Sequence, residues 1–137
     1  MKCVIRIAGS VGLKKEIIET FKRMNLNRKY SCVIIHENEK NKGMLRKIKD
    51  YVAFGDIDEK TLEKIIEKRG KSLDSKKIDF KKVAEEISKG KTMKNAGLIP
   101  VFRLHPARGG IKSTLYFPRG VLGDHKKDIN KLVEKML

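Results

Sequence analysis

The residues able to do chemistry in this chain are few and scattered. His36, His105 and His125 lie far apart, and neither Cys3 nor Cys32 belongs to a CxxC pair. Metal sites need ligands at short, regular spacings, so this arrangement does not favour one. A cysteine and a histidine could still meet in space as a nucleophile and its base. Each cysteine, however, lies in an apolar, strand-like run, which indicates two buried, reduced thiols. We therefore expect no catalytic residue, no metal, no cofactor and no small-molecule substrate.

A short glycine motif, Gly9-Ser-Val-Gly12, matches the GxxG loop that clamps RNA backbone in one class of RNA-binding domain. In that class the loop joins two helices, whereas here it follows a strand-like run, so we interpret it as a tight turn. It is neither a P-loop nor a dinucleotide fingerprint. Amides at the start of the following helix could still hold one phosphate.

The segment 106–123 is the strongest local indication of a binding function. It follows the alternating run Phe102-Arg-Leu-His105 and contains no carboxylate. Connections longer than about 12–15 residues without evident structure are usually functional or disordered. Arginine binds phosphate bidentately, and glycine lets a backbone approach a ligand closely. The alternative is a small hairpin with Leu115 and Phe117 packed into the core. The basic and glycine residues of the segment include Arg108, Gly109, Gly110, Lys112 and Arg119.

The charge is large and unevenly distributed. Lys and Arg number 33 against 17 Asp and Glu, a net charge of +16. Residues 56–90 hold 10 basic and 9 acidic side chains, while the other 102 residues hold 23 and 8. Such an excess attracts polyanions, either nucleic acid or an anionic membrane. No apolar run reaches the roughly 20 residues that span a bilayer, and the N-terminus resembles a strand more than a secretory signal. We therefore expect nucleic acid, and no membrane, as the partner.

Hydrophobic periodicity predicts one small sheet covered by helices. The apolar spacing indicates three strands, at 2–8, 32–35 and 99–105. It indicates helices at 13–24, 41–52 and 124–137, and two short helices within a charge-balanced insert at 57–90. Helices on one face of the sheet would leave Arg6, Arg103 and His105 on the open face. Lys42, Arg46 and Lys49 form a basic stripe on the second predicted helix, and an ordinary solvated face explains them equally well.

Several strings in the chain resemble a known family. They are Leu26-x-Arg28-x-x-Ser31-x-Val33, Met44-Leu45-x-x-Ile48-x-x-Tyr51-Val52, Asp50-Tyr-Val-Ala-Phe-Gly55 and Val101-Phe-Arg-Leu-His-Pro-x-Arg-Gly-Gly110. Together they are similar to the large-subunit ribosomal protein family L-thirty, in its archaeal and eukaryotic branch (eukaryotic L-seven). The resemblance covers nearly the whole chain.

The resemblance implies both a fold and a role. The fold is α/β of the α+β type: a β-α-β-α-β core with a three-stranded antiparallel sheet similar to the ferredoxin-like fold. A two-helix insert would precede the last strand, and a helix would end the chain. Residues 1–137 would form a single RNA-binding domain, with the insert at 57–90 and the basic loop at 106–123. The implied role is a structural constituent of the large ribosomal subunit, on cytoplasmic ribosomes, that stabilises RNA folding and assembly. Its partners would be ribosomal RNA near the 5S RNA attachment region, with 5S RNA itself as a further candidate, and neighbouring ribosomal proteins.

The expected RNA contacts combine the resemblance with the residue patterns. Matching positions imply Lys42, Gly43, Arg46, Lys49, Arg103, His105, Arg108, Gly109 and Gly110. The expected open sheet face adds Arg6, and the loop adds Lys112. Two other functions remain as alternatives: a free-standing RNA chaperone or regulator, and a small phosphate-ester enzyme that uses the glycine turn and Arg6.

Overall fold

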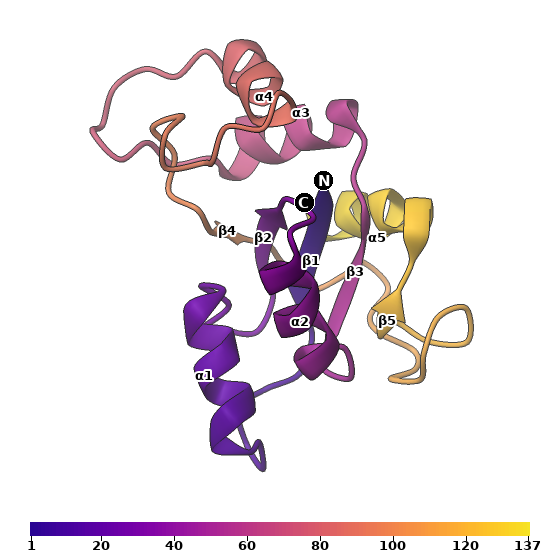
Figure 1. Cartoon of the computed structure of the whole chain (residues 1–137). Coiled ribbons are helices and arrows are strands. Elements are labelled where there is room, and N and C mark those ends of the chain that lie inside the picture. The colour runs from indigo at the N-terminus through magenta and orange to yellow at the C-terminus, as the bar shows by residue number, and fades with distance from the viewer.

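Strand β1 (Lys2–Arg6) is the centre of a five-stranded sheet in the computed structural model, which describes all residues 1–137 (Figure 1). Antiparallel partners lie on both sides of it, β2 (Ser31–Ile35) and β3 (Val52–Asp56). Two very short strands extend the edges. β4 (Phe102–Arg103) runs antiparallel to β2, and β5 (Gly123–Asp124) runs parallel to β3. The strand order is therefore β4-β2-β1-β3-β5, and the sheet is mixed.

Five α-helices cover both faces of this sheet. They are α1 (Lys15–Arg23), α2 (Glu39–Ile48), α3 (Glu59–Arg69), α4 (Phe80–Ser88) and α5 (Ile129–Met136), the last preceded by a 3₁₀ turn η1 (Lys126–Asp128). Helices α1 and α2 pack on one face, and α3, α4 and α5 lie on the other. Because each face of a strand must bury its apolar side chains against something, two separate cores result.

The alternation of β1 assigns its side chains to these two cores. Cys3 and Ile5 belong to a cluster of 22 buried residues shared with α3, α4 and α5. Val4 belongs to a second cluster of 8 that includes Phe21 of α1 and Ile48 of α2. The expectation of helices on one face only is therefore wrong, since α1 and α2 cover the face that was expected to be open.

The β-α-β-α-β start implied by the resemblance is confirmed, but the periodicity alone missed one of its strands. Tyr51 and Val52 continue the apolar spacing of the second helix, so the periodicity places them in that helix. In the structure α2 ends at Ile48, and Val52 begins β3. The predicted three-stranded antiparallel sheet is present as β2-β1-β3, and β4 and β5 widen it to five strands.

The later elements are shorter than predicted. Of the expected strand 99–105 only Phe102–Arg103 pairs with the sheet, and the last helix begins at Ile129 because residue 124 lies in β5. The two-helix insert is present as α3 and α4, which follow β3 and precede β4. It is followed by two strands, since β5 also joins the sheet after it.

The basic loop crosses one end of the sheet. It leaves β4 at one edge and enters β5 at the opposite edge. Arg103 pairs with Ser31 and Gly123 pairs with Ala53, at the beginnings of β2 and β3. Antiparallel β1 finishes at this same end. We call it the loop end, formed by residues 7–14, 24–30, 49–51 and 104–122.

Candidate functional site

The basic loop is folded rather than extended into solvent. His105 N–H donates to the carbonyl of Met136 (2.9 Å) and Arg108 N–H to that of Lys135 (3.0 Å), which ties the start of the loop to α5. Further along, the Tyr116 hydroxyl donates to the carboxylate of Asp50, next to the end of α2. These hydrogen bonds fix the course of the loop backbone that carries the basic side chains.

The loop does not form the hairpin given as the alternative. The single bridge between Tyr116 and Leu122 is parallel, whereas a hairpin pairs antiparallel strands, and Val121 N–H donates to the carbonyl of Ser113 (3.2 Å). Phe117 packs on the ring of His125, with centroids 4.6 Å apart, whereas Leu115 is 59% exposed. Phe117 thus anchors the loop on His125, Ala107 and Val121 are buried in the larger core, and Leu115 and Tyr116 stay exposed.

The Arg108-Gly109-Gly110 sequence forms a tight turn on the loop. Both glycines have positive φ angles, +81° and +75°, which side chains disfavour. Gly110 N–H donates to the carbonyl of Ala107 (2.9 Å), and Ala107 is buried. The turn holds Arg108 exposed, and that side chain forms no ion pair. Such a guanidinium is free to accept an external anion.

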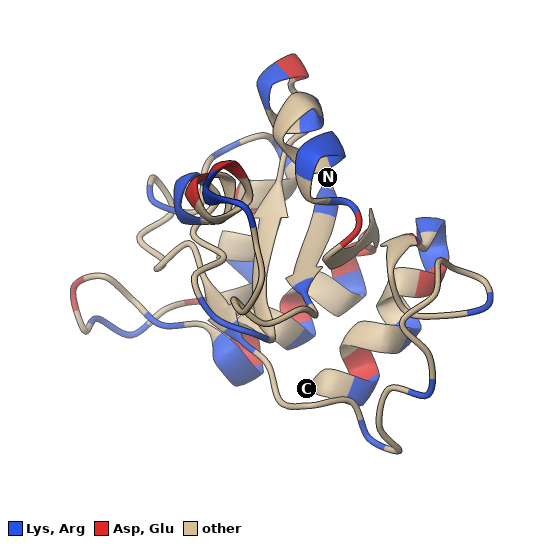
Figure 2. Ribbon diagram, turned by 90° about the horizontal axis from the view of Figure 1, so that it is seen from below, with Lys and Arg blue, Asp and Glu red and all other residues tan.

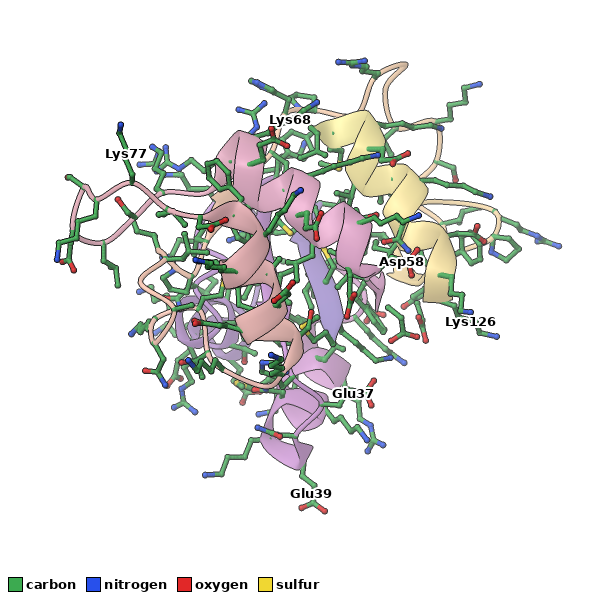
Figure 3. All side chains as sticks on the ribbon, turned by 90° about the horizontal axis from the view of Figure 1, so that it is seen from above. Glu37, Glu39, Asp58, Lys68, Lys77 and Lys126 are labelled. Carbon is green, nitrogen blue, oxygen red and sulfur yellow. The ribbon has the colours of Figure 1, made fainter.

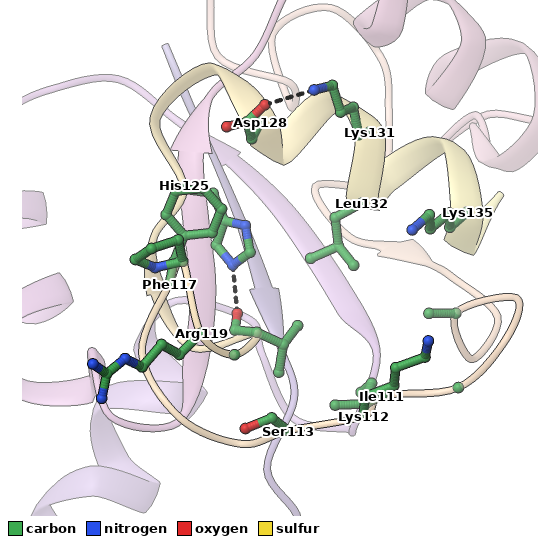
Figure 4. Close-up of a pocket in the computed structure, with 15 residues that line it drawn as sticks. Ile111, Lys112, Ser113, Phe117, Arg119, His125, Asp128, Lys131, Leu132 and Lys135 are labelled. Atoms are coloured by element: carbon green, nitrogen blue, oxygen red, sulfur yellow. Dashed lines mark hydrogen bonds and ion pairs between the residues drawn. The ribbon is translucent and has the colours of Figure 1, made fainter.

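Next to the turn is a groove of about 450 Å³ between the loop and α5 (Figure 4). Lys112 and Lys135 lie on one side of it, and Arg119 extends on the other. A third lysine, Lys131, pairs with Asp128 at 3.0 Å, so one carboxylate neutralises part of this charge.

The basic stripe on α2 lines a second groove of about 450 Å³. Its cations are Lys2, Lys42, Arg46 and Lys49. Glu37 lies among them, 3.4 Å from Lys2 and 3.9 Å from Lys42, and Asp124 also lines the groove. Arg46 and Lys49 form no ion pair. Gly43 faces open space, with no neighbouring heavy atom within 4 Å of a built Cβ, so a ligand backbone could approach it.

Arg6 is not on an open face, and its expected placement is wrong. The side chain is 3% exposed and donates to the carbonyls of Leu26 (2.7 Å) and Ala8 (3.0 Å) and to the Ser10 hydroxyl (2.9 Å). The guanidinium also lies 4.1 Å from the ring of Phe21. Burial lowers the pKa of this guanidinium, and arginine keeps its charge even so. Through its bonds to Ala8 and Ser10, Arg6 holds the glycine turn against the sheet, so its role is to stabilise the fold.

The other predicted positions are exposed, but the structure divides them. Lys42, Arg46 and Lys49 line one groove, and Gly110 and Lys112 line another. Gly43 is exposed outside the α2 groove. Arg103 and His105 are exposed at the β4 edge. Four exposed cations of the loop end are not among the predicted RNA contacts: Lys14, Arg28, Lys29 and Arg119. Arg119 was named as part of the basic loop. A usable signal existed for Arg28 and Lys29, since no carboxylate occurs between Thr20 and His36.

The two ends of the sheet differ in charge. The loop end carries seven Lys or Arg and one carboxylate, Asp50, which Tyr116 occupies. At the opposite end, the connections that follow β2 and β3 (residues 36–40 and 56–60) carry five carboxylates and two lysines. The connections that precede β4 and follow β5 (residues 89–101 and 125–128) add five lysines and one carboxylate, so this end has a smaller net positive charge than the loop end. Figure 2 looks at the molecule from the loop end, and Figure 3, from the other side, shows Glu37, Glu39 and Asp58. Phosphate contacts are therefore favoured at the loop end.

The chain offers no constellation for other chemistry. No three His, Cys, Asp or Glu side chains are grouped to hold a metal ion. Both cysteines are free and fully buried, with sulfur atoms 3.2 Å apart. No helix has the length and apolar character of a membrane span. Fold and surface together define a class: an α/β binding domain with cationic grooves.

Comparison with known proteins identifies the family. Residues 3–52 match the family described as ribosomal protein L30p/L7e. Proteins named large ribosomal subunit protein uL30 align over the full chain. The one from Archaeoglobus fulgidus is 38% identical over 99% of both chains, and the one from Methanosphaera stadtmanae is 35% identical over 100% of both. The one from Methanococcus vannielii is 38% identical, over 98% of this chain and 97% of its own. The chain belongs to the L30p/L7e family of large-subunit ribosomal proteins, which are not enzymes.

Membership in the family decides between several expectations. The resemblance seen in the sequence is confirmed, and so is the expected location on cytoplasmic ribosomes. The phosphate-ester enzyme is excluded, and the structure agrees, because Arg6 is occupied within the fold.

Proposed function

We propose that this protein binds ribosomal RNA of the large subunit through its loop end and the α2 groove, and so stabilises the folding and assembly of that RNA. The observation that carries the proposal is the set of exposed cations without an internal partner. Arg46, Lys49, Arg103, Arg108 and Lys112 all lack an ion pair. Phosphate oxygens are the acceptors that such side chains bind best in a ribonucleoprotein.

The loop end suits folded RNA for a second reason. Its cations lie on a backbone that is already ordered by hydrogen bonds to α5. A preformed surface loses little conformational entropy when it binds, so more of the interaction energy appears as affinity. The region of RNA that we propose is the one near the attachment of the 5S RNA, with neighbouring ribosomal proteins alongside.

The salt dependence of RNA binding tests the proposal. Removing one phosphate contact lowers the slope of log K against log salt by about one unit. We therefore expect Arg46→Ala and Arg108→Ala each to weaken binding to large-subunit RNA and to reduce the slope by about one unit. Lys77→Ala is the matched control, because Lys77 is an exposed lysine of the charge-balanced insert without an ion pair (Figure 3). An unchanged slope in both arginine variants would contradict these contacts.

Sedimentation distinguishes the role from that of a free-standing RNA chaperone. A structural constituent should move with large subunits on a gradient, at one copy per subunit. Protein found only at the top of the gradient would favour the chaperone.

A further inference from the structure

A third groove, of about 560 Å³, lies beside the β4 edge and is lined by four cations from distant parts of the chain. Arg28 comes from the connection between α1 and β2, and Arg103 comes from β4. Arg69 ends α3, and Lys71 follows it. Arg103 is among the predicted RNA contacts, and Arg28 belongs to the loop end. What is new is that Arg69 and Lys71 join them in one groove.

Backbone hydrogen bonds bring these segments together. Ser31 N–H donates to the carbonyl of Arg28 (3.2 Å), and Ser31 pairs with Arg103 across β2 and β4. On the other wall, Ile99 N–H donates to the carbonyl of Lys71 (2.9 Å). The cations are therefore held near one another by the fold, with no ion pair between side chains. Such a cluster of like charges is unfavourable unless an anion neutralises it.

The groove differs electrostatically from the other two that carry four cations. The α2 groove contains Glu37 and Asp124, and the α5 groove contains Asp128. No carboxylate lines the β4 groove, and none of its four cations forms an ion pair. Its positive charge is thus the least compensated of the three.

The guanidinium of Arg69 has few hydrogen-bond partners within the protein. One of its terminal nitrogens donates to the main-chain oxygen of Leu137 (2.9 Å). Its Nε is buried and has no hydrogen-bond partner, alone among the buried side-chain nitrogen and oxygen atoms. Buried polar groups are nearly always paired, so an unpaired donor calls for an explanation. The fold supplies this guanidinium with one acceptor, a main-chain oxygen of Leu137.

The remaining lining groups are suited to a nucleotide rather than to a bare ion. Asn25 and Asn27 place exposed amides at the groove, and Ile99 and Val101 provide half-buried apolar surface. Amides can donate to and accept from a base edge or a ribose 2′-hydroxyl, and apolar side chains can contact a base that is not stacked in a helix.

We propose that the β4 groove binds an unpaired nucleotide of RNA, with its phosphate held by the four cations and its ribose or base contacted by the two asparagines. This inference rests on the proposed function, since it names a further RNA site on the same protein. The site is separate from the α2 groove, so it should bind a different segment of the RNA.

The test uses the full chain and two probes, large-subunit ribosomal RNA and a single-stranded ribo-oligonucleotide. Arg28→Gln combined with Lys71→Gln removes two exposed cations that have no side-chain partner. Lys76→Gln combined with Lys77→Gln removes the same charge from the exposed insert loop, outside the groove. Unfolding midpoints that match the wild type confirm that both proteins fold.

We expect the groove variant to lower the salt slope for the oligonucleotide by about 1.4 units, at about 0.7 per single-strand phosphate contact. Affinity for the oligonucleotide should fall about tenfold or more at moderate salt, and the control variant should stay within about twofold of the wild type. Asn27→Ala should reduce the preference for the ribo- over the deoxyribo-oligonucleotide, because it removes a partner of the 2′-hydroxyl.

The outcomes separate the two proposals. If the groove variant and the control variant lose the same affinity for the oligonucleotide, the β4 site is overturned. The proposed function would still stand if the wild-type protein binds ribosomal RNA. Failure of the wild type to bind ribosomal RNA would overturn the proposed function itself. A third outcome is that the groove variant loses affinity but Asn27→Ala leaves the preference for the ribo- over the deoxyribo-oligonucleotide unchanged. That result would contradict the nucleotide contact and leave only a phosphate site.

Discussion

Arg6 has the side chain of a phosphate ligand and the surroundings of a core residue. Alternation in β1 places Lys2, Val4 and Arg6 on one face of the strand. The sequence could not show that α1 and α2 cover this face, because that follows from the packing of segments far apart in the chain. Arg6 donates to two main-chain carbonyls and a hydroxyl. Every residue has a main-chain carbonyl, so the sequence does not show which of them accept a hydrogen bond from Arg6. Residue type alone therefore could not separate Arg6 from the exposed arginines.

This environment makes Arg6 a stability residue. Arg6→Met should lower the free energy of unfolding by about 3 kcal/mol, because the buried carbonyl of Leu26 loses a charged donor and the guanidinium leaves Phe21. Urea denaturation measures the change. Arg103→Met, at an exposed position, is the control and should change stability by less than about 0.5 kcal/mol. A stable Arg6→Met protein with a reduced salt slope for RNA would instead restore Arg6 as an RNA contact.

The two cysteines lead to a pH prediction. A hydrogen bond with Cys3, together with complete burial, raises the pKa of Cys32 well above its usual range. In the unfolded chain the thiol ionises near its ordinary pKa of about 8.5. The folded state then holds a proton that the unfolded state releases, so the free energy of unfolding should fall as pH rises above about 8.5.

Comparison with a variant isolates the contribution of Cys32. Cys32→Ala should show a flatter decline above that pH, since only the remaining groups titrate. Iodoacetamide should alkylate the native protein far more slowly than the urea-unfolded protein, because the reactive thiolate is suppressed and inaccessible. Equal rates of alkylation would contradict the burial of this thiol.

Among the elements, the sequence predicted the long ones better than the short ones. Periodicity extends over enough residues in α1, α3 and α4 to identify them, and the insert helices lie where the charge-balanced segment predicted. Strand β3 was missed because Tyr51 and Val52 fit both a helical spacing and a strand. Two-residue strands such as β4 and β5 have no periodicity, so only their partners in the sheet define them.

Two glycines allow a test of how closely these elements pack. Gly55 of β3 lies against η1 and α5: an added Cβ would be 2.9 Å from the Cβ of Ile129 and would clash with the carbonyl of Lys126. Gly55→Ala should therefore force α5 away from the sheet and cost about 1–3 kcal/mol. Thermal unfolding measures the loss.

Gly43 of α2 is the matched control. Nothing would contact a Cβ at this position within 4 Å, so Gly43→Ala should stabilise the helix by about 0.5–1 kcal/mol. The same variant reports on function. If RNA backbone lies against Gly43 as proposed, RNA affinity should fall while stability rises. A rise in stability with unchanged affinity would remove Gly43 from the interface.

At the scale of the whole molecule, the fold converts a diffuse charge excess into local binding surfaces. The crossing of the loop from β4 to β5 collects basic residues from four separate connections at one end of the sheet. The sequence predicted the excess of charge and the loop that carries part of it. It could not predict the division into three grooves, because each groove combines segments whose proximity depends on strand order.

The same excess should destabilise the protein when it is free of RNA. Eight ion pairs engage only a minority of the 33 Lys and Arg, and most of them are exposed pairs, which contribute little. Repulsion among the remaining cations should therefore dominate the long-range electrostatics. Raising the salt concentration from about 10 mM to about 150 mM shortens the Debye length from about 30 Å to about 8 Å. We expect the unfolding midpoint of the free protein to rise over this range.

A variant with less charge supplies the control for that experiment. Lys76→Glu, Lys77→Glu and Lys81→Glu each remove two units of charge, which lowers the net charge from +16 to 16 − 6 = +10. These lysines are exposed and form no ion pair, so the substitutions leave the native contacts intact. The salt-induced rise in the midpoint should be smaller in this variant, because there is less repulsion to screen. A midpoint that falls with salt in the wild-type protein would mean that its ion pairs outweigh the repulsion. Such a result would contradict the predicted repulsion in the free protein, whereas the net charge of +16 would still attract a polyanion.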